Sequence, residues 1–141
     1  MEHKTLGFIK NYAITEEQVR EFHLAFNHNA PIKPTIPTPE QVAFRIKLIR
    51  EELAEVEEAI EKKDMINLLK ELCDLQYVLD GLFVVCGMDQ AKEEGFMLVH
   101  QSNMSKLGDD GKPVYREDGK VLKGPNYKPV DPIKLKKVLY G

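Results

Sequence analysis

The sequence predicts an all-α fold, a four-helix-type bundle that forms a dimer and ends in an extended, partly hairpin-like tail. Three observations predict it: stretches of apolar residues at helical spacing, capping residues where those stretches begin, and Gly- and Pro-rich sequence beyond residue 106. At 141 residues the chain is expected to be a single domain, 1–141, with a helical core over about 15–106 and a basic tail over 107–141.

The first helix is predicted over about 16–27. Thr15 and Gln18 fit a capping box, with Thr15 as the N-cap. Apolar or aromatic residues follow at helical spacing, namely Val19, Phe22, His23 and Phe26. Four prolines between Pro31 and Pro39 exclude a helix there, so this segment is expected to be an extended connector.

The second helix is predicted to begin after Thr38, with Pro39 at its first position and Gln41 at its third, and to end near Lys62 or Lys63. An apolar seam runs along it: Val42, Ile46, Ile49, Leu53, Val56 and Ile60. A second stripe, to the side of that seam, carries Phe44, Leu48, Glu52, Glu55 and Ala59.

The third helix is predicted over Met65–Cys86, with Asp64 as its N-cap and Gly87 at its end. Apolar residues nearly encircle it, which is typical of a helix buried in a core or at a subunit interface. Glu71 shares a face with leucine and valine residues. A carboxylate there is costly unless it is paired or bound to a metal.

A fourth helix is expected from an Asp89 cap to about Ser105. Beyond it, Asp118-Gly119 between two short apolar pairs predicts a hairpin over 114–122. A short helix is expected near Pro132 to Leu139.

The acidic residues of the second and third helices are the candidate site. Glu51, Glu52 and Glu55 fall within an arc of about 100°, and Glu71 and Asp74 within about 60°. If the two helices pack antiparallel, these carboxylates converge and repel one another unless cations neutralise them. Hard oxygen ligands favour Mg²⁺, with Mn²⁺ as the alternative. The plainer interpretation is a solvated acidic face paired with lysines.

The remaining composition excludes several classes of protein. The net charge of −3 does not indicate a nucleic-acid-binding surface. Cys73 and Cys86 would lie about 20 Å apart on one helix, too far for a disulfide, so a reducing compartment is favoured. No leader and no membrane-spanning run is predicted, so the expected location is the cytoplasm, without a membrane partner.

The motif Glu51-Glu52-x-x-Glu55 followed by Glu71-x-x-Asp74 resembles the signature of the all-α nucleoside triphosphate pyrophosphohydrolases. This superfamily includes MazG-like proteins, dimeric dUTPases and phosphoribosyl-ATP pyrophosphohydrolases. The resemblance continues in the segments 100–106 and 118–127 and covers roughly 19–131. It is nearest to the MazG-like subgroup that acts on dUTP.

The resemblance implies a Mg²⁺-dependent enzyme that cleaves the α–β phosphate linkage of a nucleoside triphosphate, giving a monophosphate and pyrophosphate. The implied metal ligands are Glu52, Glu55, Glu71 and Asp74, with Glu51 as the group that orients or deprotonates water. The implied substrate contacts are Asn103, Lys106, Lys123 and Tyr127 for phosphates, and Phe22, His23 and Phe26 for the base. Phosphoribosyl-ATP as substrate, or a non-catalytic helical interaction protein, are the alternatives.

Overall fold

The computed structural model describes residues 14–141, and within them the regular secondary structure is helical. The elements are α1 Thr15–Ala25, α2 Pro39–Glu61, α3 Met65–Val85, a 3₁₀ turn Asp89–Ala91, α4 Lys92–Met104 and α5 Pro132–Tyr140. The chain divides into two compact units, the first ending at Gln90 and the second spanning Ala91–Gly141. The predicted all-α class is confirmed.

The first helix, α1, begins at Thr15, one residue before its predicted start. Ile14 is the N-cap, and its carbonyl accepts from the backbone N–H of Gln18 at 3.1 Å. Thr15 is therefore the first helical residue, and its hydroxyl donates to Glu16 instead of capping the helix. The predicted capping box is wrong at this helix. The end is near the expected place, where Asn27 takes a left-handed conformation with φ of 57°.

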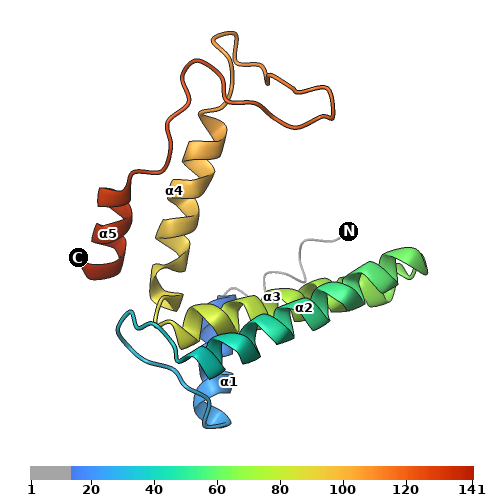
Figure 1. The fold of residues 1–141 in the computed structure, drawn as a ribbon, viewed down its shortest axis with the longest axis vertical. Coiled ribbons are helices and arrows are strands. Elements are labelled where there is room, and N and C mark those ends of the chain that lie inside the picture. Colours follow the sequence, from blue (N-terminus) through green and yellow to red (C-terminus); the bar gives the residue numbers. More distant parts are fainter. Residues whose placement is uncertain (1–13) are drawn as a thin grey trace, which may run out of the picture. The chain divides into compact units, whose positions relative to one another are not determined.

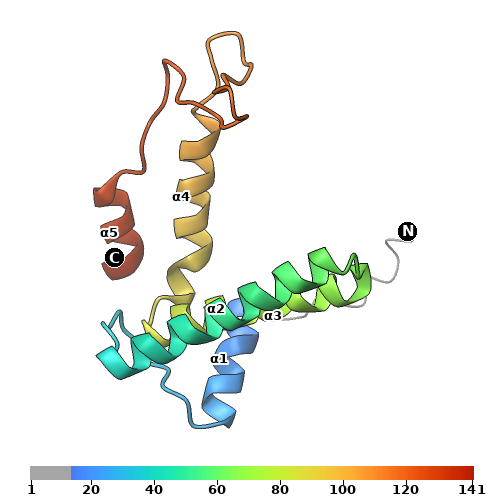
Figure 2. The same cartoon turned by 45° about the vertical axis from the view of Figure 1, so that its right-hand side comes forward.

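The two longest helices, α2 and α3, form a hairpin and lie side by side in both views (Figure 1, Figure 2). The capping box of Thr38 and Gln41 is present at the start of α2, as predicted. Asp64 caps α3 by accepting from the backbone N–H of Asn67 at 3.0 Å, also as predicted. Lys63 closes the turn between the helices in a left-handed conformation, with φ of 55°.

The face of α2 that is buried differs from the predicted seam. Val56 and Ala59 are buried, but Leu53 and Ile60 are 45% and 57% exposed. The buried face is therefore rotated toward the stripe that carries Glu52, because α3 covers only one side of α2 within this unit. Other apolar residues of the hairpin are exposed as well, among them Ile66, Leu69 and Leu72 of α3.

The proline-rich connector is held against the end of α3. Arg20 of α1 donates to the carbonyls of Ala30 and Pro31 and forms a two-pronged ion pair with Asp89, at 2.6 and 2.9 Å. Asp89 was expected to cap the fourth helix, and that expectation is wrong. Its carboxylate is drawn to Arg20 instead, and α4 begins after Ala91 without a side-chain cap.

In the second unit, α5 runs beside α4 and the segment between them is irregular (Figure 1). Asp131 caps α5, which agrees with the short helix expected from Pro132. The expected hairpin is present as a single antiparallel bridge between Tyr115 and Val121, and Gly119 makes the turn with φ of 87°. No helix within residues 14–141 combines the length and apolar character that crossing a membrane requires.

Candidate active site

The α2–α3 hairpin determines which acidic residues meet. Glu55 and Glu71 lie eight residues before and after Lys63, and Glu52 and Asp74 lie eleven before and after it. In an antiparallel hairpin, residues equally far from the turn stand at the same height. Within each pair a spacing of three places both side chains on one helix face. The tight turn therefore brings two carboxylates of α2 level with two of α3.

The structure brings these four carboxylates together. Glu52, Glu55, Glu71 and Asp74 each offer one oxygen, and the four oxygens lie within 4.8 Å of one another. Glu71 is only 5% exposed, Glu52 and Asp74 are half-buried, and Glu55 is exposed. Among the described residues, one buried oxygen of Glu52 and one of Glu71 have no hydrogen-bond partner.

This donor set fits a divalent metal ion. Buried carboxylate oxygens without donors are costly, and a cation would satisfy them. All four ligands are oxygens, which suits Mg²⁺ or Mn²⁺ better than zinc. The group of four carboxylates is also open to solvent on one side, because Glu55 is exposed. A bound ion could therefore reach both the protein and a substrate.

The pKa of Glu71 is shifted by its burial and by the charged groups around it. Burial raises the pKa of the Glu71 carboxyl, and the neighbouring carboxyl of Glu55 raises it further. Lys70 acts in the opposite direction, because its ammonium lies 3.3 Å from Glu71 Oε1 and 2.8 Å from Asp74 Oδ2. The same two contacts raise the pKa of Lys70, with Asp74 as the stronger partner.

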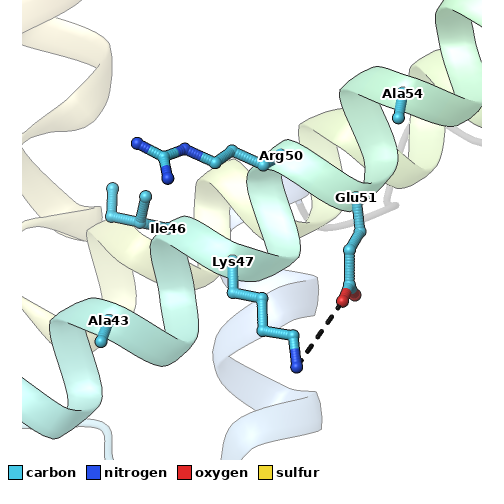
Figure 3. A pocket seen from close by; sticks show the side chains of 6 residues that line it. All are labelled: Ala43, Ile46, Lys47, Arg50, Glu51 and Ala54. Carbon is cyan, nitrogen blue, oxygen red and sulfur yellow. Dashed lines mark ion pairs between the residues drawn. The ribbon is translucent and has the colours of Figure 1, made fainter.

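Glu51 lies outside the group of four. Its carboxylate is exposed and 3.9 Å from the ammonium of Lys47. Figure 3 shows both side chains on the same stretch of α2, at an open surface depression lined by residues of that helix. The lining residues are Ala43, Ile46, Lys47, Arg50, Glu51 and Ala54.

The aromatic residues of α1 form a cluster with α3. Phe22 stacks on Phe26 with ring centroids 4.4 Å apart and meets Tyr77 edge-on at 5.7 Å. Phe26 is 62% exposed, whereas His23 is 1% exposed and donates through Nδ1 to the carbonyl of Asn29 at 3.0 Å. Phe22 and Phe26 are therefore open to a ligand, and His23 lies beneath them in the core.

Arg45 is a residue that sequence reasoning missed. It is 7% exposed, and burial lowers the pKa of its guanidinium. Its guanidinium lies over the ring of Phe44 at 5.3 Å, donates to His28 at 3.4 Å and rests against Gly81. A cavity of about 190 Å³ adjoins it, also lined by His28, Asn29, Gln41, Phe44 and Val85. The signal was its position seven residues before Glu52, two turns away on the same face.

Lys70 was missed as well. Its spacing of four from Asp74 was the available signal, since such pairs meet on a helix surface.

The second unit holds the predicted phosphate-contact residues. Lys123 lies over the ring of Tyr127, with its ammonium 4.9 Å from the ring centroid. The carbonyl of Lys106 accepts from the backbone N–H of Gly124 at 2.9 Å, which ties the end of α4 to the segment before Tyr127. Asn103, near the end of α4, is exposed.

The helical fold and the group of four carboxylates define an all-α protein with a candidate metal site. Residues 19–103 match the family model for phosphoribosyl-ATP pyrophosphohydrolase. The chain belongs to this family, and it is a pyrophosphohydrolase, a hydrolase of acid anhydrides.

Among the similar solved structures, one matches over most of both chains. It is the crystal structure of a proposed NTP pyrophosphohydrolase from Exiguobacterium sp. 255-15, with 24% sequence identity and a TM-score of 0.31. The match covers 89% of this chain and 94% of that chain. No curated protein matches the chain.

Proposed function

We propose that this protein is a Mg²⁺-dependent nucleoside triphosphate pyrophosphohydrolase that cleaves the α–β phosphate linkage, with dUTP as its preferred substrate. The observation that carries the proposal is the meeting of four carboxylates with two buried, unpartnered oxygens. Family membership supports the reaction class, and the oxygen-only donor set supports the metal.

We assign different roles in the reaction to the acidic residues of α2 and α3. Glu52, Glu55, Glu71 and Asp74 would hold the metal, with Mn²⁺ as a substitute for Mg²⁺. When bound, such an ion supplies positive charge to the phosphates and makes water more acidic. Glu51, exposed beside Glu52, would orient the attacking water and take its proton. The water oxygen bonds to the α-phosphorus as the bond to the pyrophosphate oxygen breaks.

Phosphate contacts are proposed for Asn103, Lys106, Lys123 and Tyr127. An ammonium or amide donor stabilises the charge on phosphate oxygens by charge-assisted hydrogen bonds. The neighbouring positions of Lys123 and Tyr127 support a joint role, because one ligand could meet both.

The base is proposed to bind near α1. Phe22 and Phe26 offer aromatic surface, and His23 would support them from below. Arg45 stands about 10 Å along α2 from Glu52, a distance that a nucleotide can span. Its N–H groups can bond to a carbonyl such as uracil O4, whereas cytosine presents an amino donor there. This difference favours dUTP over dCTP.

The protein is further proposed to act as a cytoplasmic homodimer in which the whole chain serves as one functional domain. Apolar side chains of the α2–α3 hairpin are exposed, among them Leu53, Ile60, Ile66 and Leu69. Such surface is costly in water, and a second copy of the hairpin would cover it.

A substrate panel tests the function. Purified protein is assayed with dUTP, dCTP, the canonical nucleotides and phosphoribosyl-ATP, with Mg²⁺ or with EDTA, and pyrophosphate and orthophosphate are measured separately. We expect pyrophosphate to be released from dUTP in the presence of Mg²⁺ and not in the presence of EDTA. Orthophosphate as the first product would contradict the site of attack. Faster turnover of phosphoribosyl-ATP would favour the activity after which the family model is named.

A further inference from the structure

Lys70 places a positive charge inside the proposed metal site. Its ammonium lies 2.8 Å from Asp74 Oδ2 and 3.3 Å from Glu71 Oε1, so it contacts two of the four gathered carboxylates. The Lys70 side chain is 64% exposed, whereas that of Glu71 is 7% exposed. One end of this interaction is therefore buried, although the lysine itself reaches in from the surface.

The contacts of Lys70 differ from those of an ordinary ion pair between two exposed side chains. Glu58 of α2 and Lys62, the C-cap of that helix, form such a pair, with the same spacing of four and both side chains 60% exposed or more. Pairs of that kind contribute little to stability, because water screens them. Lys70 differs because it compensates charge at a crowded group of acids, where like charges are close and one carboxylate is buried.

A divalent ion and the Lys70 ammonium need the same oxygens. Two cations a few ångströms apart repel, and a carboxylate oxygen that donates its lone pair to one is less available to the other. The long, flexible side chain of Lys70 lets it withdraw into solvent when an ion arrives. Metal binding would thus include the release of Lys70 from Asp74 and Glu71.

We propose that Lys70 is a tethered counter-ion that competes with the metal for Glu71 and Asp74. It stabilises the metal-free hairpin and thereby lowers metal affinity. This inference rests on the proposed function, because it takes the four carboxylates as the metal site.

The test compares Lys70→Met with the wild type and with Lys62→Met, a matched control at the C-cap of α2. Methionine keeps the length and helix preference of lysine but removes its charge. Metal affinity is measured directly, by calorimetry with Mg²⁺ and by the electron paramagnetic resonance signal of free Mn²⁺. Stability is measured by urea unfolding in EDTA and in saturating Mg²⁺. Lys70→Arg serves as the charge-retaining variant.

We expect Lys70→Met to bind metal about three- to tenfold more tightly than the wild type. It should also unfold at lower urea concentration in EDTA, with the difference shrinking in saturating Mg²⁺. Lys62→Met should match the wild type in metal affinity, and Lys70→Arg should remain close to the wild type.

Unchanged or weaker metal binding by Lys70→Met, in a wild type that does bind metal, would overturn this inference alone. Absence of metal binding in every variant would overturn both the metal site and the inference. The two failures are therefore distinguishable.

Discussion

Glu52 of α2 and Glu71 of α3 each hold a buried carboxylate oxygen without a hydrogen-bond partner in the described chain, and both belong to one group of four acids. The two residues come from different helices and are brought level by the hairpin turn. Their juxtaposition costs free energy in the metal-free protein, because neither desolvation nor mutual repulsion is fully compensated. The site is thus destabilised locally in a way that an ion would relieve.

Glu71→Gln should affect metal binding and stability in opposite directions. The amide removes a ligand charge, so metal affinity should fall by at least about tenfold. The metal-free protein should become more stable toward urea, because burial already disfavours the charged carboxylate. Calorimetry with Mg²⁺ and urea unfolding in EDTA measure the two effects.

The exposed Glu57 provides the control for that experiment, since Glu57→Gln removes a charge from α2 outside the group of four. It should leave both quantities near wild type. Equal metal affinity in the Glu71 and Glu57 variants would refute the proposed ligand role of Glu71.

The Glu51→Gln variant should show whether Glu51 acts as the general base and not as a metal ligand. Loss of a general base lowers kcat by about 100-fold or more. Metal affinity should stay within about twofold of wild type, because Glu51 lies outside the carboxylate group. Steady-state kinetics with dUTP and calorimetry with Mg²⁺ provide the measurements. A parallel loss of metal binding would instead assign Glu51 as a ligand.

Arg45→Lys should relax discrimination between bases. Lysine keeps the positive charge but loses the planar, two-pronged donor. The ratio of kcat/KM for dUTP to that for dCTP should fall about tenfold, within the usual value of one specific base contact. Urea unfolding of the variant checks that the fold persists. An unchanged ratio in a folded variant would remove Arg45 from base recognition.

Gly87→Ala should strongly destabilise the first unit. Gly87 has φ of 64°, and a Cβ there would stand 2.1 Å from the carbonyl oxygen of Lys33. The connector would have to move, so the free energy of unfolding should fall by more than about 2 kcal/mol. Gly95→Ala in α4 is the control, because a Cβ there meets nothing within 4 Å. That change should stabilise by up to about 1 kcal/mol.

Stability should decrease on acidification through His23. Burial lowers the pKa of His23, the nearby charges of Arg45 and Arg20 and the ring of His28 act in the same direction, and the hydrogen bond to Asn29 opposes them. The unfolded state therefore binds a proton more readily than the folded state. The stability due to neutral His23 is complete above the ordinary pKa of 6.5 and is lost as pH falls toward the lower folded value.

Urea unfolding at pH 7.5 and at pH 5.5 measures this effect. Because other groups also titrate, the informative quantity is the difference between the wild type and His23→Gln. The variant should lose less stability between the two pH values. An equal loss would show that His23 does not carry the pH dependence.

Local signals predicted most of the helices. Thr38 and Asp64 cap their helices as expected, because a side-chain oxygen next to a helical run has few better partners. Asp89 failed the same rule, since Arg20, distant in sequence, provides a charged partner that a free backbone N–H cannot match. Leu53 and Ile60 were expected in a buried seam, but periodicity does not reveal which part of an apolar surface another helix covers.

The sequence by itself determined the helical class, the spacing of the acids and the oxygen chemistry of the candidate metal site. Those properties depend on residues within a few turns of one another, so local geometry is sufficient to deduce them. Only the tertiary structure decided that Glu51 stands apart from Glu52, Glu55, Glu71 and Asp74, and that Lys70 reaches into their group. Burial, and the distance between charges on different helices, arise from packing and are absent from a linear pattern.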